Sequence, residues 1–190
     1  MPVAAEACDA PMKAQGFTLF DTPIGACALA WNARGIAGAW LPERDERALR
    51  ERVARRLPPS IEAAPPGAVV GAAERIVRLL EGGDDPLMDI VLDVSGIPLF
   101  HQRVYGVARA IPPGRTLTYL EVAQRLDEPG AARAVGQALG RNPFPILVPC
   151  HRVLAAHRQA GGFSAPGGIV TKYRLLEIEG AFRRGEPQLF

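Results

Sequence analysis

NPFPILVPCHRV, residues 142–153, places a cysteine beside a histidine directly after an apolar run that prolines flank. A thiolate is the reactive form of cysteine and a nearby imidazole helps to create it, so Cys150 and His151 form a candidate activated nucleophile. Neighbouring side chains point to different sides of a strand or helix. A pair between them therefore needs a bend, which the prolines could provide, or a bridging water. The competing interpretation is an inert, buried cysteine.

Length and composition fit one large or two small globular domains, because the chain has 190 residues of which 48% are hydrophobic. No apolar run approaches the roughly 20 residues of a membrane span, and no basic segment followed by an apolar one predicts a secretory signal. The 3 cysteines lack CxxC spacing. This pattern argues against a disulfide framework and for a reducing compartment, so we expect a cytoplasmic protein.

Charge is divided unevenly between the two halves of the chain. Residues 1–96 hold 10 Lys/Arg and 14 Asp/Glu, whereas residues 97–190 hold 12 and 6. The net positive half carries the Cys-His motif, which favours nucleic-acid contact by that half. An uneven but ordinary solvated surface is the alternative explanation.

The first half reads as a mixed α/β domain. Short apolar runs separated by turn residues predict a β-meander; the runs are residues 17–20, 25–31 and 35–40. Helical spacing predicts helices over 45–57 and 69–80, and alternation predicts a last strand over 89–94. We place the domain boundary at residues 95–96, which gives an N-terminal structural domain, 1–96, and a C-terminal domain, 97–190.

The second half reads as mostly helical. An apolar stripe predicts a helix over 98–110, and Thr118 with Glu121 matches a capping box that starts a helix at Tyr119. A turn at residues 128–130 separates this helix from another over 131–140. Two short helices joined by a tight turn are typical of a helix-turn-helix, although a generic helical hairpin has the same pattern.

The helix over 131–140 has two unlike faces. Val135 and Leu139 form an apolar face, and the opposite face carries Arg133, Gly136, Gln137 and Gly140. A glycine inside a helix costs about 1 kcal/mol. Close approach of the backbone to a large partner would justify that cost, and the neighbouring polar residues favour a nucleic-acid surface over packing against another helix.

Residues 142–153 resemble the active-site segment of the O6-alkylguanine-DNA alkyltransferases, also called methylated-DNA-protein-cysteine methyltransferases. Three further segments resemble the same family: IPPG at 111–114 with Thr118-Tyr119 after it, AARAVG at 131–136 and LLEIEG at 175–180. The similarity covers roughly residues 98–181. It implies a ribonuclease-H-like N-terminal α/β domain without catalysis of its own, followed by a mostly α domain with a winged-helix-like helix-turn-helix.

The resemblance implies a DNA repair protein that moves an alkyl group from O6-alkylguanine to its own Cys150 in one turnover after base flipping. O4-alkylthymine is a further candidate substrate. By this resemblance His151 acts as base through a water, Glu179 orients His151, Asn142 holds the turn, and Tyr119 places its hydroxyl near the base or the rotated phosphate. The expected partner is double-stranded alkylated DNA. We expect a monomer with no cofactor, no metal, no membrane and no obligate protein partner.

The resemblance also assigns residues to DNA and to the substrate pocket. Arg133 enters the base stack in place of the extruded nucleotide; the DNA-binding set is Tyr119, Arg133, Ala134, Gly136 and Gln137, and the pocket set is Val153, Phe163 and Ser164. The chain departs from the family where Phe163 replaces a common tyrosine and where Ala165-Pro166 precede the glycines. We therefore expect a longer or differently shaped pocket loop.

The remaining candidate residues carry weaker predictions. Cys8 and Cys27 lack the partners of a four-ligand zinc site. We expect His101 and His157 to be surface or hydrogen-bonded structural histidines. Trp31 and Trp40 lie in predicted strands, where core packing is the usual role.

Three other functions remain open at this point. A non-catalytic lesion-binding relative would lack the cysteine, which is present here. A methylation-responsive regulator would carry extra zinc and DNA-binding modules, for which this chain has no room. A cysteine hydrolase would normally have its histidine distant in sequence.

Overall fold

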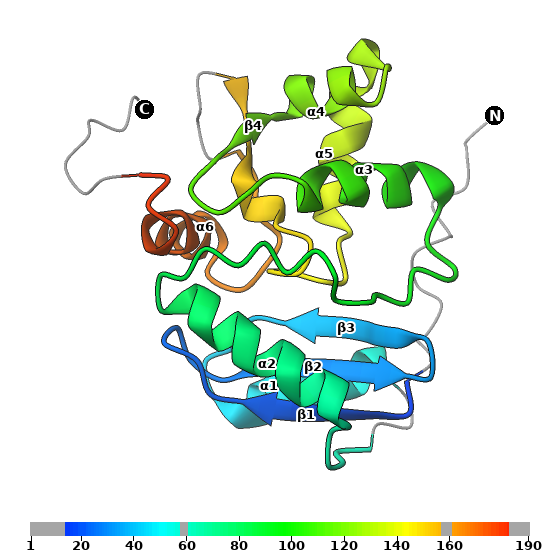
Figure 1. The fold of residues 1–190 in the computed structure, drawn as a ribbon, viewed down its shortest axis with the longest axis vertical. Helices are drawn as coiled ribbons and strands as arrows, with labels where there is room; N and C mark the ends of the chain where they lie inside the picture. Colours follow the sequence, from blue (N-terminus) through cyan, green and yellow to red (C-terminus); the bar gives the residue numbers. More distant parts are fainter. Residues whose placement is uncertain (1–13, 58–60, 157–160, 183–190) are drawn as a thin grey trace.

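The computed structural model describes residues 14–57, 61–156 and 161–182. A three-stranded sheet with a helix on each face forms the N-terminal part, and a group of short helices forms the C-terminal part (Figure 1). Cys8, His157 and the prolines at 58–59 lie outside the described residues.

The predicted meander is confirmed. Strands β1 (Gly16–Phe20), β2 (Cys27–Asn32) and β3 (Gly35–Trp40) pair antiparallel in chain order. The central strand is covered on both faces, since Leu29 and Trp31 belong to one hydrophobic cluster while Ala28 and Ala30 belong to another. This explains why β2 is apolar almost throughout instead of alternating. Trp31 and Trp40 are both buried, as predicted.

One helix packs on each face of this sheet. Helix α1 (Glu46–Arg56) begins after Asp45, whose carboxylate accepts the Ala48 N–H at 2.7 Å, and it contributes Leu49 and Val53 to one face. Helix α2 (Gly67–Leu80) contributes Val69, Ala72 and Ile76 to the other face. Both helices agree with the apolar spacing of the sequence.

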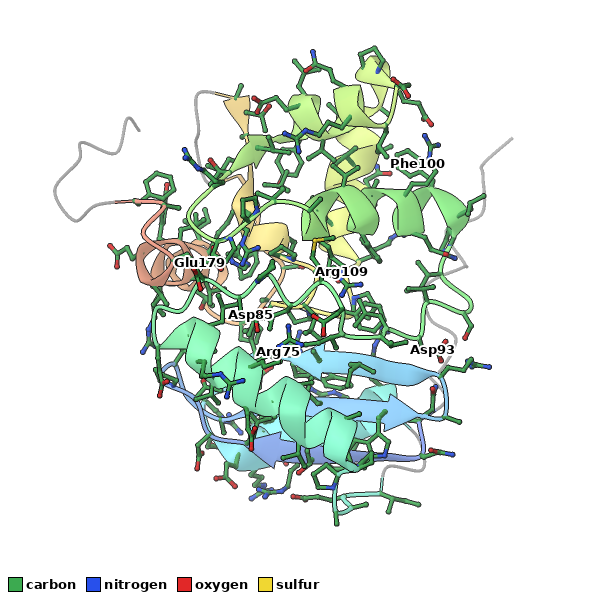
Figure 2. The ribbon with its side chains drawn as sticks, viewed as in Figure 1. Arg75, Asp85, Asp93, Phe100, Arg109 and Glu179 are labelled. Atoms are coloured by element: carbon green, nitrogen blue, oxygen red, sulfur yellow. The ribbon has the colours of Figure 1, made fainter. Side chains whose placement is uncertain are left out.

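The strand predicted over 89–94 is wrong. This segment touches the sheet through a single parallel bridge, Ile36 to Leu92. Of the residues of β3, only Ile36 bonds to its backbone there, at the Val91 carbonyl and the Asp93 N–H. The chain just before it is held by Arg109, which donates through Nη2 to the carbonyls of Leu87, Met88 and Ile90 at 2.7–2.9 Å. Arg75 also holds both ends of the preceding turn through bidentate pairs with Asp85 and Asp89 (Figure 2). Half-buried, tethered loop residues therefore imitate strand alternation, since Ile90, Leu92 and Val94 are half-buried while Val91 is exposed.

The second half is mostly helical, as predicted. It contains α3 (Leu99–Arg109), α4 (Tyr119–Arg125), α5 (Ala132–Gly140) and α6 (Gly168–Ile178), with 3-10 turns at Pro129–Ala131 and Cys150–Arg152. The capping box is confirmed, because Thr118 accepts the Glu121 N–H and Glu121 accepts the Thr118 N–H. A short parallel pair was not predicted: β4 (Leu117–Thr118) beside β5 (Val153–Leu154).

Residues of both halves share one hydrophobic cluster, which includes Leu29, Ile36, Val104 and Phe144. Polar links also cross between the halves, beyond those that Arg109 makes. The Ala39 N–H of β3 donates to the Pro143 carbonyl at 2.9 Å, and Arg174 of α6 donates to the Pro23 carbonyl at 2.9 Å. The sheet therefore supports the loop that leads to Cys150. Over the ranges that the structure describes, no helix is long and apolar enough to cross a bilayer.

Candidate active site

Cys150 begins a 3-10 turn that the preceding proline-rich loop presents. The Asn142 side chain forms hydrogen bonds to two backbone groups of this loop. Its Nδ2 donates to the Val148 carbonyl at 2.8 Å, and its Oδ1 accepts the Phe144 N–H at 2.9 Å. Ile146 adopts φ 73°, a left-handed conformation that is strained for a β-branched residue. The bend that the sequence required between Cys150 and His151 is thus built by the loop and the turn together.

His151, the residue after the cysteine, forms a buried pair with Glu179. His151 Nε2 and Glu179 Oε1 lie 2.8 Å apart, and their side chains are only 1% and 4% exposed. His151 Nδ1 has no hydrogen-bond partner among the described residues. Burial lowers the pKa of His151, although the neighbouring carboxylate opposes this shift, so we treat the imidazole as neutral near pH 7.

Arg152 completes this buried cluster. Its Nε and Nη2 donate to the two oxygens of Glu179 at 2.9 and 2.8 Å, and its Nη1 donates to the Ile111 carbonyl at 2.5 Å. Burial raises the pKa of Glu179, but His151 and Arg152 outweigh burial and bring that pKa down to about 2. Glu179 is therefore an anion that holds His151 and Arg152 at once (Figure 2 labels Glu179 at the end of α6).

The turn at residues 112–114 packs against the end of α6, next to Glu179. Gly114 adopts φ 75°, and a Cβ at this position would approach the Glu179 carbonyl oxygen to 2.9 Å. Ile111, just before this turn, supplies the carbonyl for Arg152. The IPPG segment thus closes the chain around the end of α6 where Glu179 lies, which only a glycine permits at Gly114.

Lys172 is a second buried cation of the site. It is fully buried on α6, and its Nζ donates to the Val153 carbonyl at 2.7 Å. Burial lowers the pKa of Lys172 to about 8, while the nearby Cys150 acts in the opposite direction. The ammonium also lies 6.0 Å from the centre of the Tyr119 ring.

Opposing effects act on the Cys150 thiol. Burial raises the pKa of Cys150 above its ordinary value, and the Asn142 side chain, the Lys172 charge and the backbone N–H groups of residues 150 and 151 offset only part of that rise. Burial also raises the pKa of the Tyr119 hydroxyl, and the Cys150 sulfur adds to this effect. The arrangement therefore gives the thiolate local donors while keeping the phenol protonated at neutral pH.

An open cavity of about 570 Å³ lies in front of Cys150. The described residues around it come from α4, α5 and the loop before α6: Tyr119, Ala132, Arg133, Gly136, Leu139, Gly140, Cys150, Gly162, Phe163 and Ser164. Ala134 is half-buried and Gln137 is exposed on α5. Gly136 leaves room beside the Tyr119 ring, because a Cβ there would lie 3.8 Å from the nearest ring carbon.

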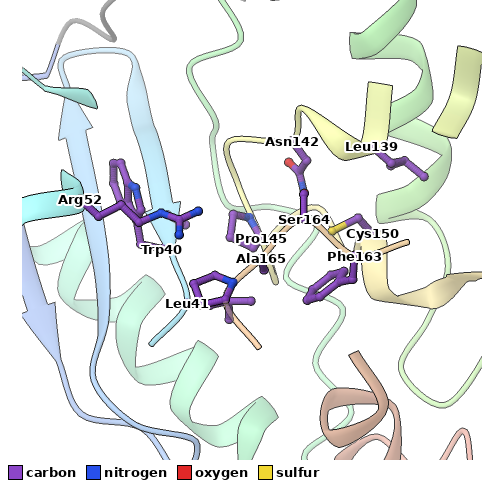
Figure 3. Close-up of a pocket in the computed structure, with 12 residues that line it drawn as sticks. Trp40, Leu41, Arg52, Leu139, Asn142, Pro145, Cys150, Phe163, Ser164 and Ala165 are labelled. Atoms are coloured by element: carbon purple, nitrogen blue, oxygen red, sulfur yellow. The ribbon is translucent and has the colours of Figure 1, made fainter. Parts of the chain in front are cut away.

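A second and smaller cavity of about 70 Å³ also reaches Cys150 (Figure 3). It shares Leu139, Cys150, Phe163 and Ser164 with the open cavity, and it extends past Pro145 to Trp40 and Arg52 of the N-terminal half. Val153 lines neither of these two cavities. It is fully buried, and its part in the site is the carbonyl that accepts Lys172.

The structure thus gathers the predicted residues from distant segments and adds two that the sequence analysis missed, Arg152 and Lys172. A signal for Lys172 exists in the sequence, because it shares a helix face with the apolar Leu175 and Leu176 at spacings of three and four. Arg152 follows the Cys-His pair directly, but nothing in the sequence shows that its guanidinium turns inward.

The weaker candidates lie apart from this site. Cys27 is buried beside Thr22, and burial raises its pKa to about 12. His101 is buried and not on the surface; its ring packs near Phe100 and Tyr105, and its Nδ1 has no partner within the described part of the chain. No cluster of His, Cys, Asp and Glu suited to a metal occurs in residues 14–57, 61–156 and 161–182.

Comparison with known proteins agrees with this arrangement. The family described as "6-O-methylguanine DNA methyltransferase, DNA binding domain" matches residues 99–181. A methylated-DNA–protein-cysteine methyltransferase of Mycobacterium tuberculosis is 34% identical over 92% of this chain and 98% of its own length. Another, from Methanothermobacter thermautotrophicus, is 41% identical over 67% of this chain and 70% of its own. The chain belongs to the methylated-DNA–protein-cysteine methyltransferase family.

Solved structures of the family share the fold. A Mycobacterium tuberculosis OGT in complex with DNA superposes with a TM-score of 0.68 at 35% identity, covering 87% of this chain and 93% of that one. The O6-methylguanine-DNA methyltransferase of Pyrococcus kodakaraensis also superposes with a TM-score of 0.68. It is 29% identical and covers 86% of this chain and 99% of that one. This methyltransferase therefore has the two-part fold of the family, with a C-terminal DNA-binding domain, and it acts in DNA alkylation repair.

Proposed function

We propose that Cys150 accepts the alkyl group from O6-alkylguanine, and from O4-alkylthymine as a second substrate, in a single stoichiometric turnover. The observation that carries this assignment is that Cys150 lines the open cavity and is followed at once by His151, which forms a buried pair with Glu179. A substrate in the cavity can reach Cys150, and the adjacent His151 is the group that can take its proton. We infer a monomer that needs no cofactor.

The proton of the thiol passes to His151 through a water at Nδ1. Nε2 is tied to Glu179, so Nδ1 is the ring nitrogen that remains for this exchange. Glu179 stabilises the imidazolium that forms, and Arg152 holds Glu179 in place. Asn142 and Lys172 favour the resulting thiolate.

The transfer itself is a displacement at carbon. The thiolate forms the new carbon–sulfur bond while the carbon–O6 bond breaks, and the electron pair of that bond leaves with guanine. Tyr119 lines the same cavity and keeps its proton at neutral pH, so it can donate to the leaving base. The thioether on Cys150 is a poor leaving group, which is why one molecule acts once.

The modified base reaches the cavity by leaving the duplex, at a cost of a few kcal/mol. Arg133 lies at the rim of the cavity on α5 and fills the vacated stack. Helices α4 and α5 form the helix-turn-helix of a winged-helix-like domain, with Ala134, Gly136 and Gln137 on its DNA side. The N-terminal part is ribonuclease-H-like. The homologue crystallised with DNA supports double-stranded DNA as the partner.

The test is direct mapping of the transferred group. Incubation with a duplex that contains O6-methylguanine should place one methyl on the peptide that carries Cys150, detected by mass spectrometry. Cys150→Ala should abolish transfer and leave DNA affinity within a few-fold. Methylation of Cys8 or Cys27 in the wild-type protein would overturn the assignment.

A further inference from the structure

The small cavity, which shares Cys150 with the open one, extends from the reacting residue to the N-terminal half of the molecule. Trp40 and Arg52 lie at one side of it and Cys150 and Phe163 at the other, with Pro145 between them (Figure 3). Trp40 belongs to β3 and Arg52 to α1. Neither element contributes to the open cavity in front of Cys150.

A long substituent leaves the reaction line sideways. In a displacement at carbon the sulfur and O6 lie on opposite sides of the attacked atom, so the rest of the substituent projects to the side of that line. Leu139, Phe163 and Ser164 line both cavities next to Cys150. A substituent longer than methyl that follows these residues away from Cys150 enters the small cavity.

Size and polarity restrict what the small cavity accepts. A volume of about 70 Å³ holds two or three non-hydrogen atoms, since water fills about 30 Å³ and benzene needs a cavity of about 150 Å³. Arg52 brings a positive charge to its far side. Its Nη1 donates to Glu43 at 2.6 Å, and its side chain is 38% exposed. A guanidinium carries five N–H donors, so one pair with Glu43 does not exhaust it.

We propose that this cavity is a subsite for the distal end of O6 substituents longer than methyl, and that Arg52 selects substituents that end in a carboxylate. The proposal rests on Cys150 as the acceptor. With O6-carboxymethylguanine, the thiolate forms a bond to the methylene carbon, the carbon–O6 bond breaks, and its electron pair leaves with guanine, which takes a proton. The product is S-carboxymethylcysteine, with its carboxylate directed toward Arg52.

The experiment compares two isosteric lesions in the same duplex, O6-carboxymethylguanine and the uncharged O6-carbamoylmethylguanine. The quantity measured is the ratio of their transfer rates, with O6-methylguanine as the reference for each protein. Arg52→Gln should lower the carboxymethyl to carbamoylmethyl ratio about five-fold, as for a partly exposed charge-assisted hydrogen bond. Glu43→Gln should raise the ratio, because it removes the competing carboxylate. Arg52→Lys should keep most of the preference.

Arg55→Gln is the matched control, because Arg55 is exposed on the same helix and lines neither cavity. An equal fall in the ratio for Arg52→Gln and Arg55→Gln would overturn the subsite, because it would show that any positive charge on α1 attracts the carboxylate. A shift of the same sign in Arg52→Gln and Glu43→Gln would overturn it in favour of a structural ion pair. If Arg52→Gln does not fold, the sign of the Glu43→Gln effect decides. Absence of methyl transfer to Cys150 in the wild-type protein would instead contradict the proposed function.

Discussion

Lys172 is a buried charge whose effect on the thiol can be measured separately from its packing. Lys172 lowers the pKa of Cys150, so Lys172→Met should move the pH dependence of methyl transfer to higher pH. Lys172→Arg retains the charge and should leave the profile closer to that of the wild type. Transfer rates on O6-methylguanine duplexes between about pH 6 and 9 give both profiles. A uniformly slower Lys172→Met variant with an unshifted profile would mean that Lys172 acts through the fold.

Glu179 couples the site to the stability of the whole chain. Its pKa lies near 2 in the folded protein instead of the ordinary 4.5, so the unfolded chain binds this proton more readily. The stabilisation is therefore complete above about pH 4.5 and is lost as the pH falls toward 2, with a total on the order of 3 kcal/mol. Urea unfolding across this range should show a steeper loss for the wild type than for Glu179→Gln.

The Glu179→Gln variant also shows how much of the acid sensitivity comes from carboxylates other than Glu179. The pKa values of Asp85, Asp89 and Asp93 are lowered by their own arginine partners, so they contribute to the acid sensitivity of both proteins. Only the difference between the two proteins in how steeply the free energy of unfolding falls with pH is due to Glu179. Equal slopes would show that the buried carboxylate does not carry the predicted linkage. The variant should also be less stable at neutral pH, because Arg152 loses a buried partner.

At the scale of single elements, α5 and α3 offer a matched pair of helical glycines. Gly136 lies on α5 beside the open cavity, and Gly106 lies exposed on α3 with nothing within 4 Å of a Cβ. Alanine at either position should stabilise its helix by about 1 kcal/mol. Gly136→Ala alone should weaken binding to duplex DNA, on the order of ten-fold for 1.4 kcal/mol of lost contact.

Fluorescence anisotropy with a labelled duplex, together with thermal unfolding of both variants, tests this prediction. The expected pattern is higher stability in both proteins and lower affinity in Gly136→Ala only. Equal affinities would remove the argument that the α5 backbone approaches DNA at Gly136. Since a Cβ at Gly136 would make an ordinary 3.8 Å contact with Tyr119, misfolding is not the expected reason for a loss.

For the molecule as a whole, the shared core predicts one cooperative unfolding transition in place of two. Leu29 and Ile36 of the sheet lie in the same cluster as Val104 and Phe144, and the Ala39–Pro143 bond crosses between the halves. Both tryptophans belong to the N-terminal half, so their fluorescence reports on the sheet, whereas far-UV circular dichroism reports largely on the C-terminal helices. The two signals should give the same midpoint in urea. Separate midpoints would indicate two independently stable domains.

The sequence by itself determined the local elements and the chemistry of the nucleophile. Apolar spacing and turn residues are encoded within short windows, so the meander, helices α1 to α5 and the capping box at Thr118 followed from them, whereas α6 was not predicted. The Cys150-His151 pair and its flanking prolines likewise predicted a reactive thiol. Local alternation was misleading at residues 89–94, because a half-buried loop held by Arg109 at Ile90 and by Arg75 at Asp89 shows the same pattern as a paired strand.

The tertiary structure alone decided which distant residues meet. Whether Arg152 turns inward depends on Glu179 at the far end of α6, and whether Lys172 influences the thiol depends on its bond to the Val153 carbonyl. Likewise, Arg52 reaches the small cavity only because β3 and α1 pack beside the proline-rich loop. A sequence pattern reports a residue's own segment, whereas burial, pKa and cavity shape arise from neighbours that folding brings together.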